Sequence, residues 1–195
     1  MYGKDIMDAP FLAFHQYLTR LPLDEAVIGE TLAAFALRRY RKGEYFSFAG
    51  QVQDKIGFVV DGLFFMFVDD ENGRTFTKDF LTSNQFLLAT FDPAKGSLAN
   101  IRALRPSVIL EARYSDIQRL FARYPQFAAL SRRRMEREVE AIYARLESFA
   151  GMEAKARYRL FREKYGPIEG EIPQYLIASY LGITPTQLSR IRKKL

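Results

Sequence analysis

The sequence predicts an α+β protein in which an antiparallel β-barrel or β-roll is followed by a long helix and a C-terminal helix-turn-helix. Three observations predict this order. Short Phe- and Val-rich segments with glycine turns fill residues 40–112, an apolar repeat in steps of four and three spans residues 135–149, and residues 172–195 read helix, glycine, helix. Short strands at such spacing indicate a barrel or roll of about eight strands.

The first 112 residues are expected to start as helix and continue as strands. Apolar residues recur at helical spacing from about residue 9 to residue 36. Residues 63–68 are too aromatic and too few for a helix, and they predict a strand. Asn72 and Gly73 follow, and Asn-Gly is the strongest short hairpin signal. A last strand is expected at residues 107–112.

A second helical region is expected after the strands. A helix with a capped start at Ser115 and Asp116 precedes Pro125, which opens a long helix. Apolar side chains in this long helix follow the a/d pattern of a coiled-coil seam. They are Met135, Val139, Ile142, Leu146 and Phe149. The repeat covers barely two heptads, which is compatible with a homodimer interface or with packing of the helix on its own chain. We favour the homodimer. The charged residues beside the seam are expected to form a mostly solvated flank.

The pattern over residues 172–195 predicts two short helices joined by a tight turn. Gly182 can adopt the positive φ that a sharp helix stop needs. Thr184 is suited to cap the second helix and Pro185 to open it. Gln187 completes a Thr-x-x-Gln capping box. The local chemistry therefore predicts where the first helix stops and the second begins.

The second of these helices is amphipathic. Its apolar stripe is Leu188, Ile191 and Leu195, and its opposite face carries Thr186, Ser189, Arg190 and Lys193. Such a helix fits the recognition helix of a helix-turn-helix, whereas the alternative is an ordinary helical hairpin with a solvated basic face. The net charge of the chain is +6. Nine basic and four acidic residues follow position 150, so five of those six charges lie in the segment that would read DNA.

Composition excludes several kinds of site. The chain has no cysteine and one histidine, His15, which excludes disulfides, thiolate metal sites and multi-histidine metal sites. It has neither a phosphate-cradling Gly-x-x-x-x-Gly-Lys loop nor a nucleophile elbow, and its acidic cluster at residues 69–71 fits a solvated turn. We therefore expect no enzyme and no metal. Without a signal peptide or an apolar run of membrane-spanning length, we expect a cytoplasmic protein with no membrane contact.

Two segments carry a family resemblance, KGEYFSFAGQVQDKIGFVVDGLFFMFVDDENGRTFTKDF and IASYLGITPTQLSRIRKKL. In the order roll, long helix and helix-turn-helix, they resemble the CRP/FNR superfamily of bacterial transcription regulators. The resemblance implies a cyclic-nucleotide-binding-like roll (a double-stranded β-helix) and a homodimer across the long helix. It also implies double-stranded DNA as a partner, with two recognition helices in successive major grooves of a near-palindromic site. RNA polymerase is a further candidate partner.

The resemblance carries DNA-contacting positions onto this chain. Base-contacting positions fall on Pro185, Thr186 and Arg190. Arg190 can bind guanine O6 and N7 bidentately, Thr186 can touch a base edge or a thymine methyl, and Pro185 has no side-chain donor. Candidate phosphate contacts are Gln174, Thr184, Gln187, Ser189, Lys193 and Lys194. Because the sequence stops at Leu195, we expect most of the family's β-hairpin wing to be lacking.

The family's cyclic-nucleotide cassette is altered in the stretch NQFLLATFDPAKGSLANIRAL. Leu88 and Ala89, or their neighbours, stand at the place of its ribose-binding Gly-Glu pair, and Ser97 and Leu98 stand where Ser-Arg would hold the phosphate. A leucine cannot neutralise a buried phosphate, so we expect no tight binding of cyclic AMP and no cofactor. Any effector pocket in the roll would use Phe86, Leu88, Ala89, Ser97, Leu98 and Arg102.

The sequence thus predicts an effector or sensor roll at residues 1–124, a dimerisation helix at residues 125–150 and a DNA-binding helix-turn-helix domain at residues 151–195. The leading hypothesis is a homodimeric, sequence-specific DNA-binding regulator that does not depend on cyclic AMP. The alternative is an effector-binding module that acts through protein contacts and binds DNA weakly or not at all.

Overall fold

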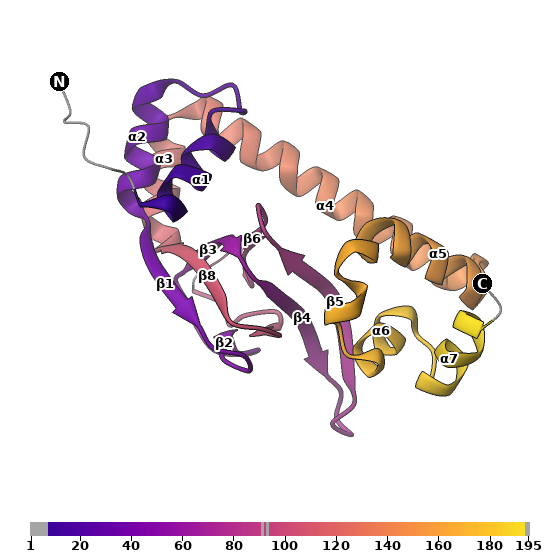
Figure 1. Cartoon of the computed structure of the whole chain (residues 1–195). Helices are drawn as coiled ribbons and strands as arrows, with labels where there is room; N and C mark the ends of the chain where they lie inside the picture. The colour runs from indigo at the N-terminus through magenta and orange to yellow at the C-terminus, as the bar shows by residue number, and fades with distance from the viewer. Residues whose placement is uncertain (1–7, 91, 93, 194–195) are drawn as a thin grey trace. The chain divides into compact units, whose positions relative to one another are not determined.

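The computed structural model describes residues 8–90, 92 and 94–193. In this part of the chain two helices come first, strands follow, and helices complete the fold (Figure 1). The helices are α1 (Ala9–Leu18), α2 (Glu25–Ala34), α3 (Tyr114–Arg123), α4 (Pro125–Gly151), α5 (Ala154–Tyr165), the 3₁₀ helix η1 (Gly166–Glu171), α6 (Gln174–Leu181) and α7 (Pro185–Lys193). The strands are β1 (Ala36–Tyr40), β2 (Tyr45–Ser47), β3 (Ile56–Asp61), β4 (Leu63–Asp69), β5 (Thr75–Thr82), β6 (Phe86–Leu87), β7 (Asn100–Ala103) and β8 (Ser107–Ala112).

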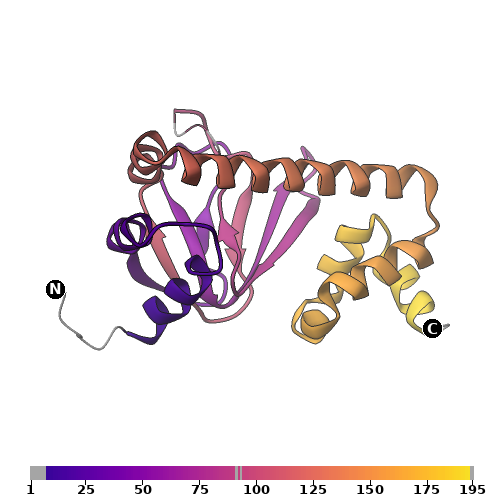
Figure 2. The ribbon, with the colours of Figure 1, turned by 90° about the horizontal axis from the view of Figure 1, so that it is seen from above.

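The strands form two four-stranded sheets, in the orders β1-β8-β3-β6 and β2-β7-β4-β5. Strand β8 pairs antiparallel with both β1 and β3, so that Ile109 lies opposite Arg38 and opposite Val59. The pairs β3–β6 and β2–β7 are antiparallel as well. The predicted antiparallel roll is confirmed, and so is the long helix, which Figure 2 shows as one continuous element, α4.

Strand β8 contributes to two apolar cores because successive side chains of a strand point to opposite faces. Ile109 belongs to a core between the two sheets, together with Phe46, Val59, Phe64, Leu81, Leu87, Ala89, Ile101 and Ala103. Leu110 belongs to a second core under α1, α2 and α3. There the ring of Phe14 stacks on Phe58 at a centroid distance of 4.4 Å. Each large apolar side chain buried in this way stabilises the fold by about 1.5–3 kcal/mol.

The start of α3 is set by a side chain from elsewhere in the chain. Ser115 was expected to cap the helix itself, but α3 begins one residue earlier, at Tyr114. Asp54, in the loop before β3, accepts hydrogen bonds from the Ser115 amide at 2.8 Å and from the Ser115 hydroxyl at 2.6 Å. A carboxylate at this place satisfies an amide that the first turn leaves without an intrahelical partner. The cap is therefore tertiary and could not be read from the local sequence.

The β4–β5 turn has the chemistry that the sequence predicted. Gly73 has a φ of +74°, a conformation that side chains other than glycine rarely adopt. The Asp70 carboxylate accepts hydrogen bonds from the amides of Asn72 and Arg74, each at 2.8 Å. Such Asx-type bonds fix a turn locally, which is why this hairpin could be recognised without tertiary information.

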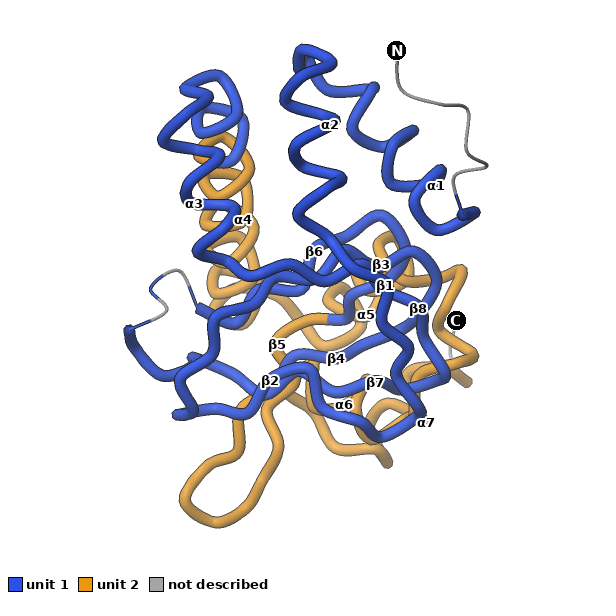
Figure 3. Tube along the Cα trace, turned by 90° about the vertical axis from the view of Figure 1, so that its left-hand side faces the viewer, with its two compact units in different colours: residues 1–66, 80–131 blue, residues 67–79, 132–195 orange. Residues whose placement is uncertain are grey.

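The chain forms two compact units, residues 1–66 with 80–131 and residues 67–79 with 132–195 (Figure 3). The far part of the β4–β5 hairpin thus belongs to the unit that contains α5, α6 and α7, and α4 contributes to both units. This grouping differs from the division expected at residues 124 and 150, because it follows spatial contacts rather than the order of the chain.

Replacing Asp54 by alanine is expected to destabilise the protein by about 1 kcal/mol, because the first turn of α3 loses its cap. Asp8 is the matched control, since it flanks α1 without making a side-chain capping bond. Denaturant unfolding of Asp54→Ala and Asp8→Ala measures both effects. Equal losses in the two variants would show that Asp54 has no specific capping role.

Candidate nucleic-acid interface

Helix α6 ends in a left-handed turn at Gly182, as the sequence predicted. Gly182 has φ +66° and ψ +36°. The Ile183 amide donates to the Ala178 carbonyl at 3.0 Å, and the Gly182 amide donates to the Ser179 carbonyl at 3.2 Å. These two bonds form a Schellman motif, which satisfies the last carbonyls of the helix. The chain leaves α6 in a fixed direction as a result.

Helix α7 starts with the predicted capping box. The Gln187 amide donates to the Thr184 hydroxyl at 3.2 Å, and the Thr184 amide donates to the Gln187 side-chain oxygen at 2.9 Å. Pro185 opens the helix. The Gln187 oxygen is therefore engaged in holding the helix start, which leaves its amide nitrogen as the group that could meet a phosphate.

The two faces of α7 separate as predicted within the described residues. Leu188 is fully buried, and Ile191 is half-buried. The candidate DNA contacts that the structure describes are all exposed: Gln174, Thr184, Pro185, Thr186, Gln187, Ser189, Arg190 and Lys193. Lys194 and Leu195 lie outside the described residues. One exposed aromatic was missed by the sequence analysis, Tyr175, which follows Gln174 in the first turn of α6 and interrupts its apolar pattern.

Helix α6 is held by the edge of β5. The Ser179 hydroxyl donates to the Thr75 carbonyl at 2.6 Å and accepts from the Thr77 amide at 2.9 Å. A small hydroxyl side chain thus takes the place of a neighbouring strand along this edge. Because these bonds come from α6, they leave the exposed side of α7 unobstructed.

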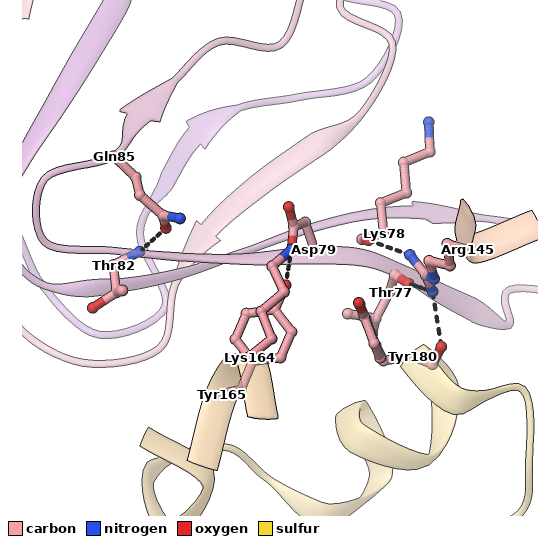
Figure 4. Close-up of polar contacts among 9 residues, drawn as sticks. All are labelled: Thr77, Lys78, Asp79, Thr82, Gln85, Arg145, Lys164, Tyr165 and Tyr180. Carbon is pink, nitrogen blue, oxygen red and sulfur yellow. Dashed lines mark hydrogen bonds and ion pairs between the residues drawn. The ribbon is translucent and has the colours of Figure 1, made fainter. Parts of the chain in front are cut away.

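Arg145 of α4 joins three elements of this unit (Figure 4). Its guanidinium donates to the carbonyls of Thr77 and Tyr180, each at 2.8 Å, and to the Lys78 carbonyl. The guanidinium also lies 4.0 Å from the centroid of the Tyr180 ring, a cation–π distance. This arginine is one of the charges beside the seam, which were expected to form a mostly solvated flank. The structure instead uses it to satisfy backbone carbonyls of β5 and of the end of α6.

Asp79 makes a second link between β5 and the helices (Figure 4). Its carboxylate accepts a hydrogen bond from the Tyr165 hydroxyl and pairs with the Lys164 ammonium at 3.2 Å. Burial raises the pKa of Tyr165, and the negative charge of Asp79 raises it further. Tyr165 therefore remains a protonated hydrogen-bond donor at neutral pH, and the end of α5 stays attached to the hairpin.

The seam on α4 is open to solvent. Met135, Val139, Ile142, Leu146 and Phe149 have exposed fractions between 36% and 59%. Phe149 also approaches the turn between α6 and α7: a Cβ atom built on Gly182 would lie 2.9 Å from its ring. The last side chain of the seam is thus packed beneath the turn between α6 and α7.

The proposed effector-pocket residues do not converge on one site. Ala89 lies in the core between the sheets, whereas Phe86 and Leu88 pack against the core under the helices. Leu98 is 64% exposed. Ser97 is buried, and its hydroxyl has no hydrogen-bond partner within the described residues. The interior of the roll is filled by aromatic and aliphatic side chains.

Arg102 lies on the outer face of its strand. Its neighbours Ile101 and Ala103 are in the core between the sheets, so strand alternation directs Arg102 the other way. Its guanidinium lies 5.0 Å from the Phe65 ring centroid and 3.4 Å from the Tyr45 hydroxyl. It contributes no positive charge to the interior of the roll.

Two negative findings concern the described residues. They contain no group of three or more histidine, cysteine, aspartate or glutamate side chains arranged to hold a metal ion. None of their helices combines the length and hydropathy that crossing a membrane would require.

Comparison with known proteins gives the family of the roll. Residues 37–124 match the sequence model of the cyclic nucleotide-binding domain. No curated protein is significantly similar to the chain in sequence.

Solved structures give the fold of the whole chain. FixK2 from Bradyrhizobium japonicum is 16% identical over 83% of this chain and 84% of its own, with a TM-score of 0.76. CLP, a c-di-GMP responsive global regulator of Xanthomonas campestris, is 15% identical over 88% and 91%, with a TM-score of 0.71. The Thermus thermophilus catabolite activator protein is 17% identical over 96% and 86%, with a TM-score of 0.58.

Identities this low establish a shared fold, and the sequence match adds the family of the roll. Residues 37–124 form a domain of the cyclic nucleotide-binding family, within a chain that has the fold of the CRP/FNR-family regulators.

Proposed function

We propose that this protein is a homodimeric transcription regulator that reads a near-palindromic DNA site through α7 and does not depend on cyclic AMP. One observation carries the proposal. Helix α7 is capped at its start and anchored by a fully buried Leu188, while Thr186, Ser189, Arg190 and Lys193 on its other side are exposed. An exposed basic and hydroxyl face on a rigidly held helix is what major-groove reading requires.

Arg190 is the residue proposed to read a base. It is exposed, and no hydrogen bond or ion pair joins its guanidinium to another described residue. A guanidinium in this state can bind guanine O6 and N7 bidentately without first breaking a contact in the protein. Ser189 and Lys193 flank it and would contact phosphates, which position the helix but carry no sequence information.

The open seam on α4 supports the dimer. Five apolar side chains at a/d spacing expose between 36% and 59% of their surface, which is costly unless a second copy covers them. A twofold pair of recognition helices would explain the expected near-palindromic site.

Independence from cyclic AMP is supported by the apolar composition of the core between the sheets, as far as the described residues show it. A buried cyclic phosphate needs a cation or several donors, because an uncompensated buried anion is very costly. Arg102 is on the outer face, Leu98 stands where an arginine would be expected, and the core between the sheets is apolar. The roll would therefore act as a scaffold or bind an effector of another kind.

Replacing Arg190 by alanine is expected to weaken binding to the selected DNA site by about 1–3 kcal/mol and binding to random duplex much less. The site is first selected from a random pool of duplexes, with and without cyclic AMP. Lys193→Ala is the matched control: it should weaken binding to both duplexes similarly and reduce the salt slope by about one. Equal losses for Arg190→Ala on both duplexes would contradict base reading.

The same selection separates the two hypotheses for the whole protein. A twofold-symmetric motif that emerges without cyclic AMP supports the proposal. A pool that stays random, with binding insensitive to salt, would favour the alternative, an effector-binding module that acts through protein contacts.

Replacing Ile142 by glutamate is expected to raise the dimer dissociation constant by about 100-fold or more, because two carboxylates would be buried across the seam. Ala141→Glu places the same charge on an exposed position of α4 beside the seam and should leave the dimer intact. Sedimentation equilibrium of both variants measures this. Equal effects would show that the seam is not the interface.

A further inference from the structure

The last turn of α7 contains an arginine that is not part of the exposed face. Arg192 donates from its Nη2 to the Glu169 carboxylate at 2.5 Å and from its Nε to the Tyr158 hydroxyl at 3.1 Å. Only 26% of its side chain is exposed. Its guanidinium also lies 5.8 Å from the centroid of the Tyr158 ring. The charge of Arg192 is thus directed into the protein, away from the side of α7 that carries Arg190.

Glu169 of η1 is the centre of this cluster. One of its oxygens accepts from both Arg192 and the Tyr158 hydroxyl, the latter at 2.6 Å. Its other oxygen lies 3.6 Å from the Nε of Arg162. The Glu169 side chain is only 17% exposed. Burial raises the pKa of Tyr158, and its hydrogen bond to Glu169 raises it further, so the hydroxyl stays protonated and keeps donating.

The cluster and Leu188 attach the same side of α7 at two points. Leu188 and Arg192 are four residues apart, which places them one above the other on a helix. Leu188 is fully buried and Arg192 is bonded to α5 and η1. One attachment point leaves a short helix able to tilt and rotate, whereas two points a turn apart fix both movements.

Arg192 would otherwise be read as one more phosphate contact, because it lies in a basic helix end. Its geometry argues against this. Turning Arg192 toward DNA would leave the largely buried Glu169 with the neutral Tyr158 hydroxyl and the more distant Arg162 as partners, and breaking such a charge pair is strongly unfavourable. Arg192 therefore holds α7 in place and is not a DNA contact.

We propose that Arg192, Glu169 and Tyr158 form a clamp that sets the orientation of α7, so that Arg192 is a positioning residue for DNA recognition and does not contact DNA. This inference rests on the proposed DNA-binding function. It makes Glu169, an acidic residue in a DNA-binding domain, a determinant of sequence specificity.

The clamp predicts that weakened binding is confined to the selected duplex. Glu169→Gln should weaken binding to the selected site by about three- to tenfold, because Arg190 is no longer aimed accurately. The same change removes a negative charge and releases Arg192, so binding to random duplex should stay equal or become tighter. Glu163→Gln is the matched control, since Glu163 is an exposed glutamate of α5 and its loss changes the net charge equally.

The salt slope identifies the role of Arg192. If it is a positioning residue, Arg192→Ala weakens binding to the selected site but leaves the salt slope on random duplex unchanged. A phosphate contact would lower that slope by about one, as is expected for Lys193→Ala. A lowered slope for Arg192→Ala, or the same outcome for Glu169→Gln and Glu163→Gln, would overturn the proposal.

Hydrogen exchange of the full-length protein without DNA tests the clamp by itself. Amides of α7 should exchange faster in Glu169→Gln than in the wild type, and Glu163→Gln should match the wild type. Unchanged exchange in Glu169→Gln would overturn the clamp. If the wild-type protein shows no preference for any duplex while α7 exchange rises as expected, the proposed DNA function fails and the clamp stands as a structural feature of α7.

Discussion

The unit that contains α6 and α7 depends on the guanidinium of Arg145. It bonds carbonyls of Thr77 and Lys78 on β5 and of Tyr180 at the end of α6, from a position on α4. Backbone carbonyls that are buried without a donor cost about 1–3 kcal/mol each, and one arginine has enough donors to satisfy three of them. A planar fork is required here, because a lysine ammonium could not span a strand and a helix end in the same geometry.

The remaining contacts of this unit hold its helices together and leave the polar face of α7 exposed. Ser179 and Asp79 connect the helices to β5, Phe149 packs under the turn at Gly182, and Glu169 holds Arg192. All of these contacts are made by α4, α5, η1 or α6, or by the inner side of α7. The polar side of α7 is consequently exposed, while its other side is held by the buried Leu188 and by the bond between Arg192 and Glu169. Holding a helix in place before it binds lowers the ordering cost of binding.

The roll has a different character, since the core between its two sheets is apolar. The core between the sheets combines the aromatic rings of Phe46 and Phe64 with aliphatic side chains such as Ile109. Arg102 lies on the outer face of its strand. The fold of a cyclic nucleotide-binding domain is thus kept by packing, which tolerates many apolar sequences, whereas ligand chemistry needs particular charges at particular positions. Apolar packing therefore fixes the fold of the roll without fixing which effector it would bind.

Much of this structure was determined by the sequence alone, because the physics is local. The Gly182 turn, the Thr184–Gln187 capping box, the hairpin at Gly73 and the seam of α4 depend on residues within a few positions of one another. Other features join residues that are far apart in the chain, and only the tertiary structure decided them. Asp54 caps a helix 61 residues away, Arg145 reaches a strand 68 residues before it, and Arg192 turns inward to Glu169. A charged side chain looks the same in the sequence whether water or a buried carbonyl will solvate it, and that choice is made only when the chain has folded.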